Sequence, residues 1–99
     1  MILVRNIFQL KFGKAKEAKE LWKDGAKILR KAGFSSLRIL TDLVGTYYTF
    51  ILESEYKSLT DYESAMQSES DSAEWRSFYP KFAALVESGK REILNIEEL

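Results

Sequence analysis

The first segment of the chain alternates between apolar and polar positions, which is typical of a strand with one buried face. Most of the even-numbered positions between residues 2 and 11 are apolar and form the drier face: Ile2, Val4, Phe8 and Leu10. One amide, Asn6, interrupts this face. We therefore predict a strand over residues 2–11 that buries a single polar side chain.

The next segment has apolar residues at helical spacing and predicts a helix from about Lys14 to Ala32. Gly33 follows where a helix needs a left-handed cap. Gly25 lies in the middle of this helix, where glycine costs about 1 kcal/mol relative to alanine. We expect close packing against another backbone to be the reason for it.

Three further strands are predicted from β-branched and aromatic segments and from the turn residues beside them. They cover residues 35–41, residues 46–53 after the turn Asp42–Gly45, and residues 90–97 after Gly89. The first two of these strands form a hairpin, and Gly89 is expected to end the helix that precedes the last strand.

A second helical region fills the chain between the hairpin and the last strand. Ser58 begins a motif that resembles a capping box, and the polar residues 68–72 interrupt the helix that follows. Asp71 or Ser72 can cap a second helix. Pro80 lies inside that helix and removes one backbone donor, so we expect a bend or a restart there.

The predicted order of elements is β-α-β-β-α-β, with the second helical region split in two. This order indicates an α+β fold of the ferredoxin-like type, a four-stranded antiparallel sheet with its first and third strands at the centre. Arg38, Lys90 and Arg91 suit the predicted edge strands, because charged side chains discourage edge-to-edge aggregation. Ninety-nine residues suffice for one core, so residues 1–99 are expected to form a single domain.

In such a fold both helical segments pack on one face of the sheet, and the opposite face has no helix to cover it. The residues expected on this face are mostly apolar: Leu3, Ile7, Ile39 or Leu40, Tyr47, Ile51 and Ile93. An apolar face on the order of 300 Å² is more than a monomer usually exposes. We therefore predict a homodimer in which two sheets close against each other and form an α+β barrel.

Three arginines are also expected on the helix-free face, namely Arg5, Arg38 and Arg91. There they can pair with acidic side chains of the second subunit, which is the interpretation we prefer. The alternative is an anion-binding lumen inside the dimer.

The sequence contains no histidine and no cysteine. Disulfides, Cys/His zinc sites, thiolate nucleophiles, histidine-based triads and a histidine-ligated haem are thereby excluded. Glu53 and Glu55 share one strand face and can in principle chelate Mg²⁺ or Ca²⁺, but a solvated strand end is the simpler interpretation. We predict neither a cofactor nor a metal site.

The 15 basic and 15 acidic residues balance each other. A net charge of zero argues against a dedicated partner among nucleic acids or anionic membranes. Residues 47–52 are among the longest uncharged stretches and are far shorter than the roughly 20 apolar residues of a membrane span. The first ten residues also lack the pattern of a signal peptide, so we expect a cytoplasmic protein.

Several short motifs together resemble the NIPSNAP-like and antibiotic-biosynthesis-monooxygenase-like members of the dimeric α+β barrel superfamily. They are Leu10-Lys11-Phe12-Gly13-Lys14, Tyr56-Lys57-Ser58-Leu59, Glu74-Trp75-Arg76-Ser77-Phe78 and Glu92-Ile93-Leu94. The resemblance implies a pair of ferredoxin-like subunits that form a barrel, with a cleft in each subunit between sheet and helices. The superfamily includes monooxygenases that use no cofactor, haem-degrading enzymes and many proteins without known activity.

The candidate site is that cleft, and its predicted lining is one amide among aromatic side chains: Asn6, Trp22, Tyr48, Trp75 and Tyr79. A buried amide without partners costs about 1–3 kcal/mol, so Asn6 needs a partner. That partner is either helix-terminal backbone or a buried water, or it is a ligand. The position of Asn6 resembles that of an active-site asparagine in the monooxygenase and haem-degrading branches. The haem degraders also use a histidine that this chain lacks, so haem degradation is not expected.

Two hypotheses about function follow. The first is a homodimeric small-molecule-binding or structural protein without turnover. The second is a cofactor-independent monooxygenase or related enzyme acting on an aromatic or polyketide-like molecule, with Asn6 and either Tyr48 or Tyr79 in the site. The aromatic side chains can also form a plain core. A cavity of about 300 Å³ or more beside Asn6 would favour ligand binding, and a filled core would remove the enzyme hypothesis.

Overall fold

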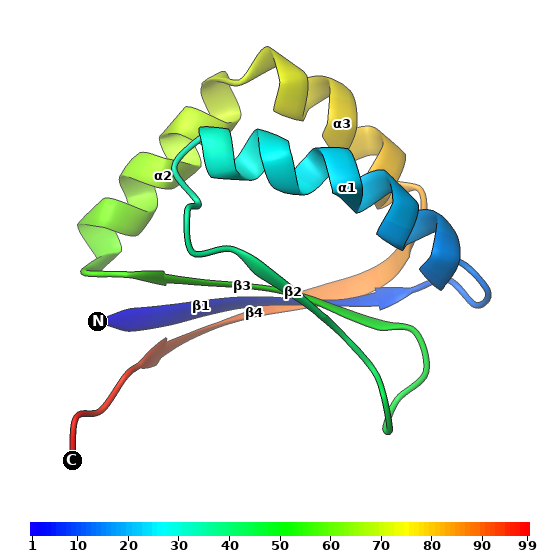
Figure 1. Cartoon of the computed structure of the whole chain (residues 1–99), viewed down its shortest axis with the longest axis horizontal. Coiled ribbons are helices and arrows are strands. Elements are labelled where there is room, and N and C mark those ends of the chain that lie inside the picture. The colour runs from blue at the N-terminus through cyan, green and yellow to red at the C-terminus, as the bar shows by residue number, and fades with distance from the viewer.

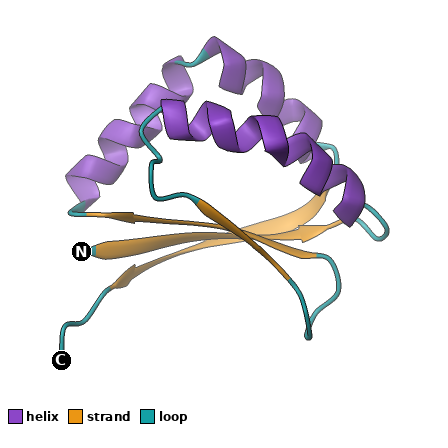
Figure 2. Ribbon diagram, viewed as in Figure 1, coloured by secondary structure: helices purple, strands orange, loops and turns teal.

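The computed structural model describes residues 1–99, and it contains a four-stranded antiparallel sheet with three helices on one face (Figure 1; Figure 2). The elements are β1 (Ile2–Leu10), α1 (Ala15–Lys31), β2 (Arg38–Thr41), β3 (Thr49–Tyr56), α2 (Leu59–Asp71), α3 (Ala73–Ala83) and β4 (Val86–Asn95). The strand order β2-β3-β1-β4 places β1 and β3 at the centre. The predicted ferredoxin-like α+β fold is thereby confirmed. None of the helices combines the length and the apolar character needed to cross a membrane.

The helix ends follow the capping residues of the sequence. Gly33 has φ +113°, and the N–H groups of Gly33 and Phe34 donate to the carbonyls of Arg30 and Leu29, which is a Schellman motif. The hydroxyl of Ser58 accepts from the N–H of Asp61 at the start of α2. Ser72 caps α3 in the same way.

Three boundaries differ from the prediction. The hydroxyl of Ser36 bonds both backbone groups of Glu55 and replaces the strand pairing expected there, so β2 begins at Arg38. Strand β3 begins at Thr49, because Asp42 accepts the N–H of Thr49 and residues 42–48 form a longer loop than the predicted turn. Helix α3 continues through Pro80 and ends at Ala83.

Gly89 was predicted to end this helix but lies inside β4, opposite Phe8. A Cβ atom at Gly89 would lie 3.0 Å from Cδ1 of Phe8. The glycine therefore leaves room for the Phe8 ring beside the edge strand.

Aromatic side chains form the centre of the core between sheet and helices. The ring of Phe82 is fully buried and lies 5.1 Å from the ring of Phe8 and 5.1 Å from that of Trp22, both in edge-to-face geometry. Trp22 also meets Phe78 edge-on at 5.0 Å. The indole N–H of Trp22 is buried among these rings without a hydrogen-bond partner. The face of an aromatic ring is only a weak hydrogen-bond acceptor for an N–H group.

Gly25 packs against aromatic rings and not, as predicted, against another backbone. A Cβ atom there would lie 2.3 Å from Cζ of Phe78 and 2.8 Å from Cε3 of Trp22. The glycine therefore allows α1 to approach α3 closely enough to seat the Phe78 ring.

Gly25→Ala is expected to lower the free energy of unfolding by about 1–2 kcal/mol, although alanine favours a helix. Overpacking typically costs about 1–3 kcal/mol, which exceeds the helix-propensity gain of up to about 1 kcal/mol. Urea denaturation measures the change. Asp24→Ala is the control, because it improves the propensity of the same helix at an exposed position. A Gly25→Ala protein as stable as the wild type would contradict the close packing.

Tyr56 provides a pH-dependent test of the core. Burial raises the pKa of Tyr56 to about 12, although the hydroxyl of Ser54, 3.0 Å away, donates to the phenol oxygen and favours the ionised form. In the unfolded chain this phenol ionises near pH 10. The stability that the buried neutral phenol contributes to the native state is therefore fully present below pH 10 and is lost as the pH rises through about 12.

We expect this phenol to cost the native state about 2–3 kcal/mol of stability across that window. Guanidinium denaturation between pH 9 and 12 measures the loss in the wild type and in Tyr56→Phe. The variant should lose less stability over the window, whereas the exposed Tyr47→Phe should follow the wild type. Parallel curves for the wild type and Tyr56→Phe would show that the phenol is not buried as described.

The helix-free face carries a row of alternating charges that crosses all four strands: Arg38, Glu53, Arg5 and Glu92. Arg5 Nε donates to Glu53 Oε2 at 3.1 Å, and Arg38 Nε donates to Glu53 Oε1 at 2.7 Å. Glu53 is only 4% exposed under these two side chains. Arg5 and Arg38 therefore find their partner within one chain and not, as expected, in a second subunit.

The strand register corrects several predicted positions on this face. Ile93 pairs with Val4 and Ile39 pairs with Leu52, so both belong to the helix side, and Leu40 takes the helix-free position. Tyr47 lies in the loop after β2. Leu3 lies on the helix-free face as predicted, and Leu40, Ile51 and Ile7 form an apolar row there that Lys90 continues on β4. No group of three or more acidic side chains is placed to hold a metal ion.

Candidate functional site

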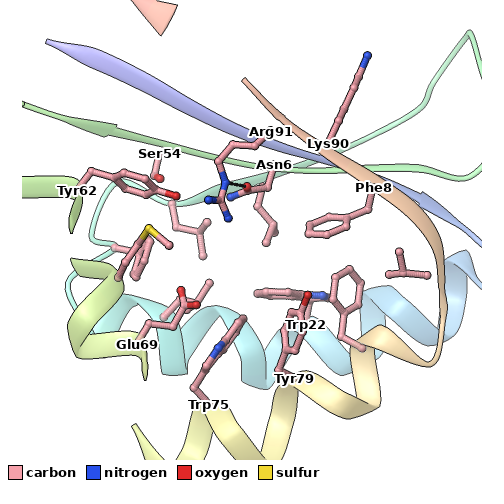
Figure 3. Close-up of a pocket in the computed structure, with 18 of the residues that line it drawn as sticks. Asn6, Phe8, Trp22, Ser54, Tyr62, Glu69, Trp75, Tyr79, Lys90 and Arg91 are labelled. Carbon is pink, nitrogen blue, oxygen red and sulfur yellow. Dashed lines mark hydrogen bonds between the residues drawn. The ribbon is translucent and has the colours of Figure 1, made fainter. Parts of the chain in front are cut away.

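A cavity of about 540 Å³ lies between the sheet and the helices (Figure 3). Aromatic side chains from α1 and α3 form the wall on the helix side: Trp22, Trp75, Tyr79 and Phe82. Asn6 and Phe8 on β1 and Gly89 and Arg91 on β4 contribute the sheet side. The volume falls within the range of about 300–1,000 Å³ that is typical of ligand pockets.

Asn6 and Arg91 form the polar part of the sheet side. The two residues are directly paired across β1 and β4, and Arg91 Nε donates to Asn6 Oδ1 at 2.7 Å. The Oδ1 of Asn6 thus has a side-chain partner, and the helix-terminal backbone does not supply it. Arg91 was expected on the helix-free face. Its pairing with Asn6 places it on the helix side, because residues opposite each other in a ladder share a face.

Tyr62 and Glu69 enter the cavity from α2, two turns apart on one helix face (Figure 3). The guanidinium of Arg91 lies 5.9 Å from the centroid of the Tyr62 ring. Burial raises the pKa of both Tyr62 and Glu69, and the positive charge of Arg91 opposes the rise in each. The polar groups of the cavity are therefore electrostatically coupled.

The structure brings together four of the five predicted site residues. Asn6, Trp22, Trp75 and Tyr79 all line the cavity. Tyr48, the fifth, does not line it.

The loop before β3 explains the misplacement of Tyr48. Because β3 begins only at Thr49, Tyr48 falls in this loop, with φ +59°. Its ring packs edge-on against Phe12 at 4.8 Å, outside the cavity.

Sequence reasoning missed Arg91, Tyr62 and Glu69 as members of the site. Tyr62, Ala65, Met66 and Glu69 have the spacing of one helix face, so this pattern gives a signal for Glu69. The pairing of Arg91 with Asn6 depends on the register of β4, and a one-residue slip reverses the face of every side chain.

The fold and the cavity together define a ferredoxin-like α+β protein with a ligand-sized pocket between its two layers. The sequence pattern of the NIPSNAP family matches residues 5–97, so the chain belongs to the NIPSNAP family. This confirms the resemblance found in the sequence motifs.

Solved structures support the same fold. A NIPSNAP family protein from Agrobacterium tumefaciens is 23% identical, with a TM-score of 0.91, and the match covers 98% of this chain and 93% of that one. An uncharacterised NIPSNAP domain protein from Burkholderia xenovorans is 17% identical, with a TM-score of 0.86 over 98% and 95% of the two chains. A protein described as an antibiotic biosynthesis monooxygenase is 11% identical, with a TM-score of 0.75 over 99% and 100%. No curated protein matches the chain.

Proposed function

We propose that this protein binds a small aromatic molecule in the cavity between its sheet and its helices. The observation that carries the proposal is the open volume of about 540 Å³ inside a wall of aromatic rings. Ligand pockets typically occupy about 300–1,000 Å³ and combine apolar walls with a few polar groups. Here Asn6, Arg91, Tyr62 and Glu69 are those polar groups.

We also propose that the protein works as a homodimer paired through the helix-free sheet face. The row Leu40, Ile51 and Ile7 supplies an apolar stripe that no helix covers. The loop after β2 extends to the same side of the sheet (Figure 1). Its side chains Leu43 and Val44 are almost fully exposed in the single chain. Pairing of two identical faces would remove these apolar groups from water.

A second candidate function is a cofactor-independent monooxygenase acting on an aromatic or polyketide-like molecule. The observation in its favour is the fold shared with the protein described as an antibiotic biosynthesis monooxygenase. In this chain Tyr62, Glu69 and Tyr79 are cavity side chains that can donate or accept a proton. Oxygen consumption with an electron-rich aromatic ligand separates the two candidates, since binding alone consumes none.

A thermal-shift titration with 2-naphthamide, a neutral two-ring amide, tests the binding function. The ligand should raise the melting temperature of the wild type, because it stabilises only the folded state. Trp75→Ala removes part of the aromatic wall, Asn6→Leu removes the amide, and each should reduce the shift. Phe12→Ala is the control, because it removes an exposed aromatic ring outside the cavity. Equal shifts in all four proteins would count against the cavity as the binding site.

A further inference from the structure

The donors of the sheet-side wall converge on one point of the cavity. Arg91 uses its Nε to bond Asn6 Oδ1, and this contact holds the guanidinium so that its remaining nitrogens point into the cavity (Figure 3). The Asn6 oxygen is occupied by the contact, which leaves its amide N–H groups as donors. The Tyr62 phenol lies beside the guanidinium.

Arg91 forms no salt bridge, unlike the other arginines on the sheet. Arg5 and Arg38 both form salt bridges with Glu53. No carboxylate lies within 4.0 Å of Arg91, where such a bridge would form. Lys90, the next residue on β4, points away from the cavity (Figure 3). Arg91 is therefore the cation that a bound molecule meets.

We propose that the ligand is an aromatic carboxylate whose anionic group binds Arg91 and the amide of Asn6. Its rings lie against the Trp75 and Tyr79 side chains on the helix side, which pack on each other with ring centroids 5.2 Å apart. This inference rests on the proposed binding function and adds the chemical class of the ligand. A planar guanidinium can bind both oxygens of a carboxylate, and such charge-assisted bonds are about twice as strong as neutral ones.

Glu69 lies across the cavity from Arg91 and limits the affinity for an anion. Its carboxyl group enters from α2, with no hydrogen-bond partner in the chain (Figure 3). A second negative charge in the cavity is repelled whenever Glu69 is ionised. Glu69→Gln is therefore expected to bind an aromatic carboxylate several-fold more tightly than the wild type, and an aromatic ammonium ion more weakly.

Isothermal titration calorimetry with three isosteric probes tests the inference: 2-naphthoate, 2-naphthamide and 2-naphthylmethylammonium. The wild type should bind 2-naphthoate about tenfold or more tightly than the amide, and the ammonium ion least. Arg91→Gln should remove the preference for the carboxylate and leave the affinity for the amide nearly unchanged. Lys90→Gln is the matched control: Lys90 borders the cavity, but it pairs with Ile7, so its charged side chain points to the helix-free face and the variant should keep the preference (Figure 3).

The outcomes separate this inference from the proposed function. Equal affinities of the wild type for the carboxylate and the amide would overturn the inference and leave aromatic binding intact. No binding of any probe would overturn both. The wild-type preference should also shrink between 50 and 500 mM NaCl, because salt screens the charge at the cavity mouth. This measurement needs no variant, so the inference stays testable if Arg91→Gln does not fold.

Discussion

Phe82→Ala is expected to lower the free energy of unfolding by about 3–5 kcal/mol, which is the usual range for removing a fully buried phenylalanine ring. Phe82 is 0% exposed and joins the helix layer to both central strands. Its ring contacts those of Phe8 on β1, Phe50 on β3 and Trp22 on α1. The substitution leaves a void next to the existing cavity, and the neighbouring rings lose the dispersion contacts that the Phe82 ring supplied.

Chemical denaturation of Phe82→Ala and Phe12→Ala gives a matched comparison. Both variants lose a phenylalanine ring, but Phe12 is 82% exposed. The Phe12 variant should change stability by less than about 0.5 kcal/mol. Similar losses for the two variants would show that the core is not centred on Phe82.

Ile7→Asp is expected to convert the proposed homodimer into a monomer. Ile7 lies at the centre of the helix-free face, with Ile51 on one side and Lys90 on the other. Twofold pairing would bury two aspartates in an apolar stripe. The dimer dissociation constant should rise by about a thousandfold or more, which corresponds to about 4 kcal/mol.

Size-exclusion chromatography with light scattering measures the change at micromolar concentration. Leu59→Asp is the control, because Leu59 is also exposed but lies at the start of α2 on the helix side. The control should remain dimeric, and circular dichroism should show that both variants are folded. A wild type that is monomeric, or an Ile7→Asp protein that stays dimeric, would argue against pairing through this face.

The fold was predictable because the local signals for each helix and strand agree with the overall order of elements in a ferredoxin-like fold. Alternation in β1, helical spacing in α1 and capping residues such as Gly33, Ser58 and Ser72 each mark an element independently. The boundaries that failed depend on side-chain hydrogen bonds between distant residues. The Ser36 hydrogen bonds replace the pairing expected at the start of β2, and the Asp42 hydrogen bond delays the start of β3.

The site was only partly predictable for a related reason. Asn6 stands out because it is a polar side chain on an apolar face, and Trp75 and Tyr79 follow from helical spacing. Arg91 faces the cavity only because of the register between β1 and β4. Register depends on the whole sheet, so no local pattern in residues 90–97 marks Arg91 as a site residue.

The most direct test of binding in the cavity is a titration of ¹⁵N-labelled protein with 2-naphthamide, followed by NMR. The chain has two tryptophans, Trp22 and Trp75, and both line the cavity. Ring currents of a bound aromatic molecule should shift both indole N–H signals and leave the signals of the helix-free face in place. Two unshifted indole signals at saturating ligand, or shifts confined to the helix-free face, would contradict the account.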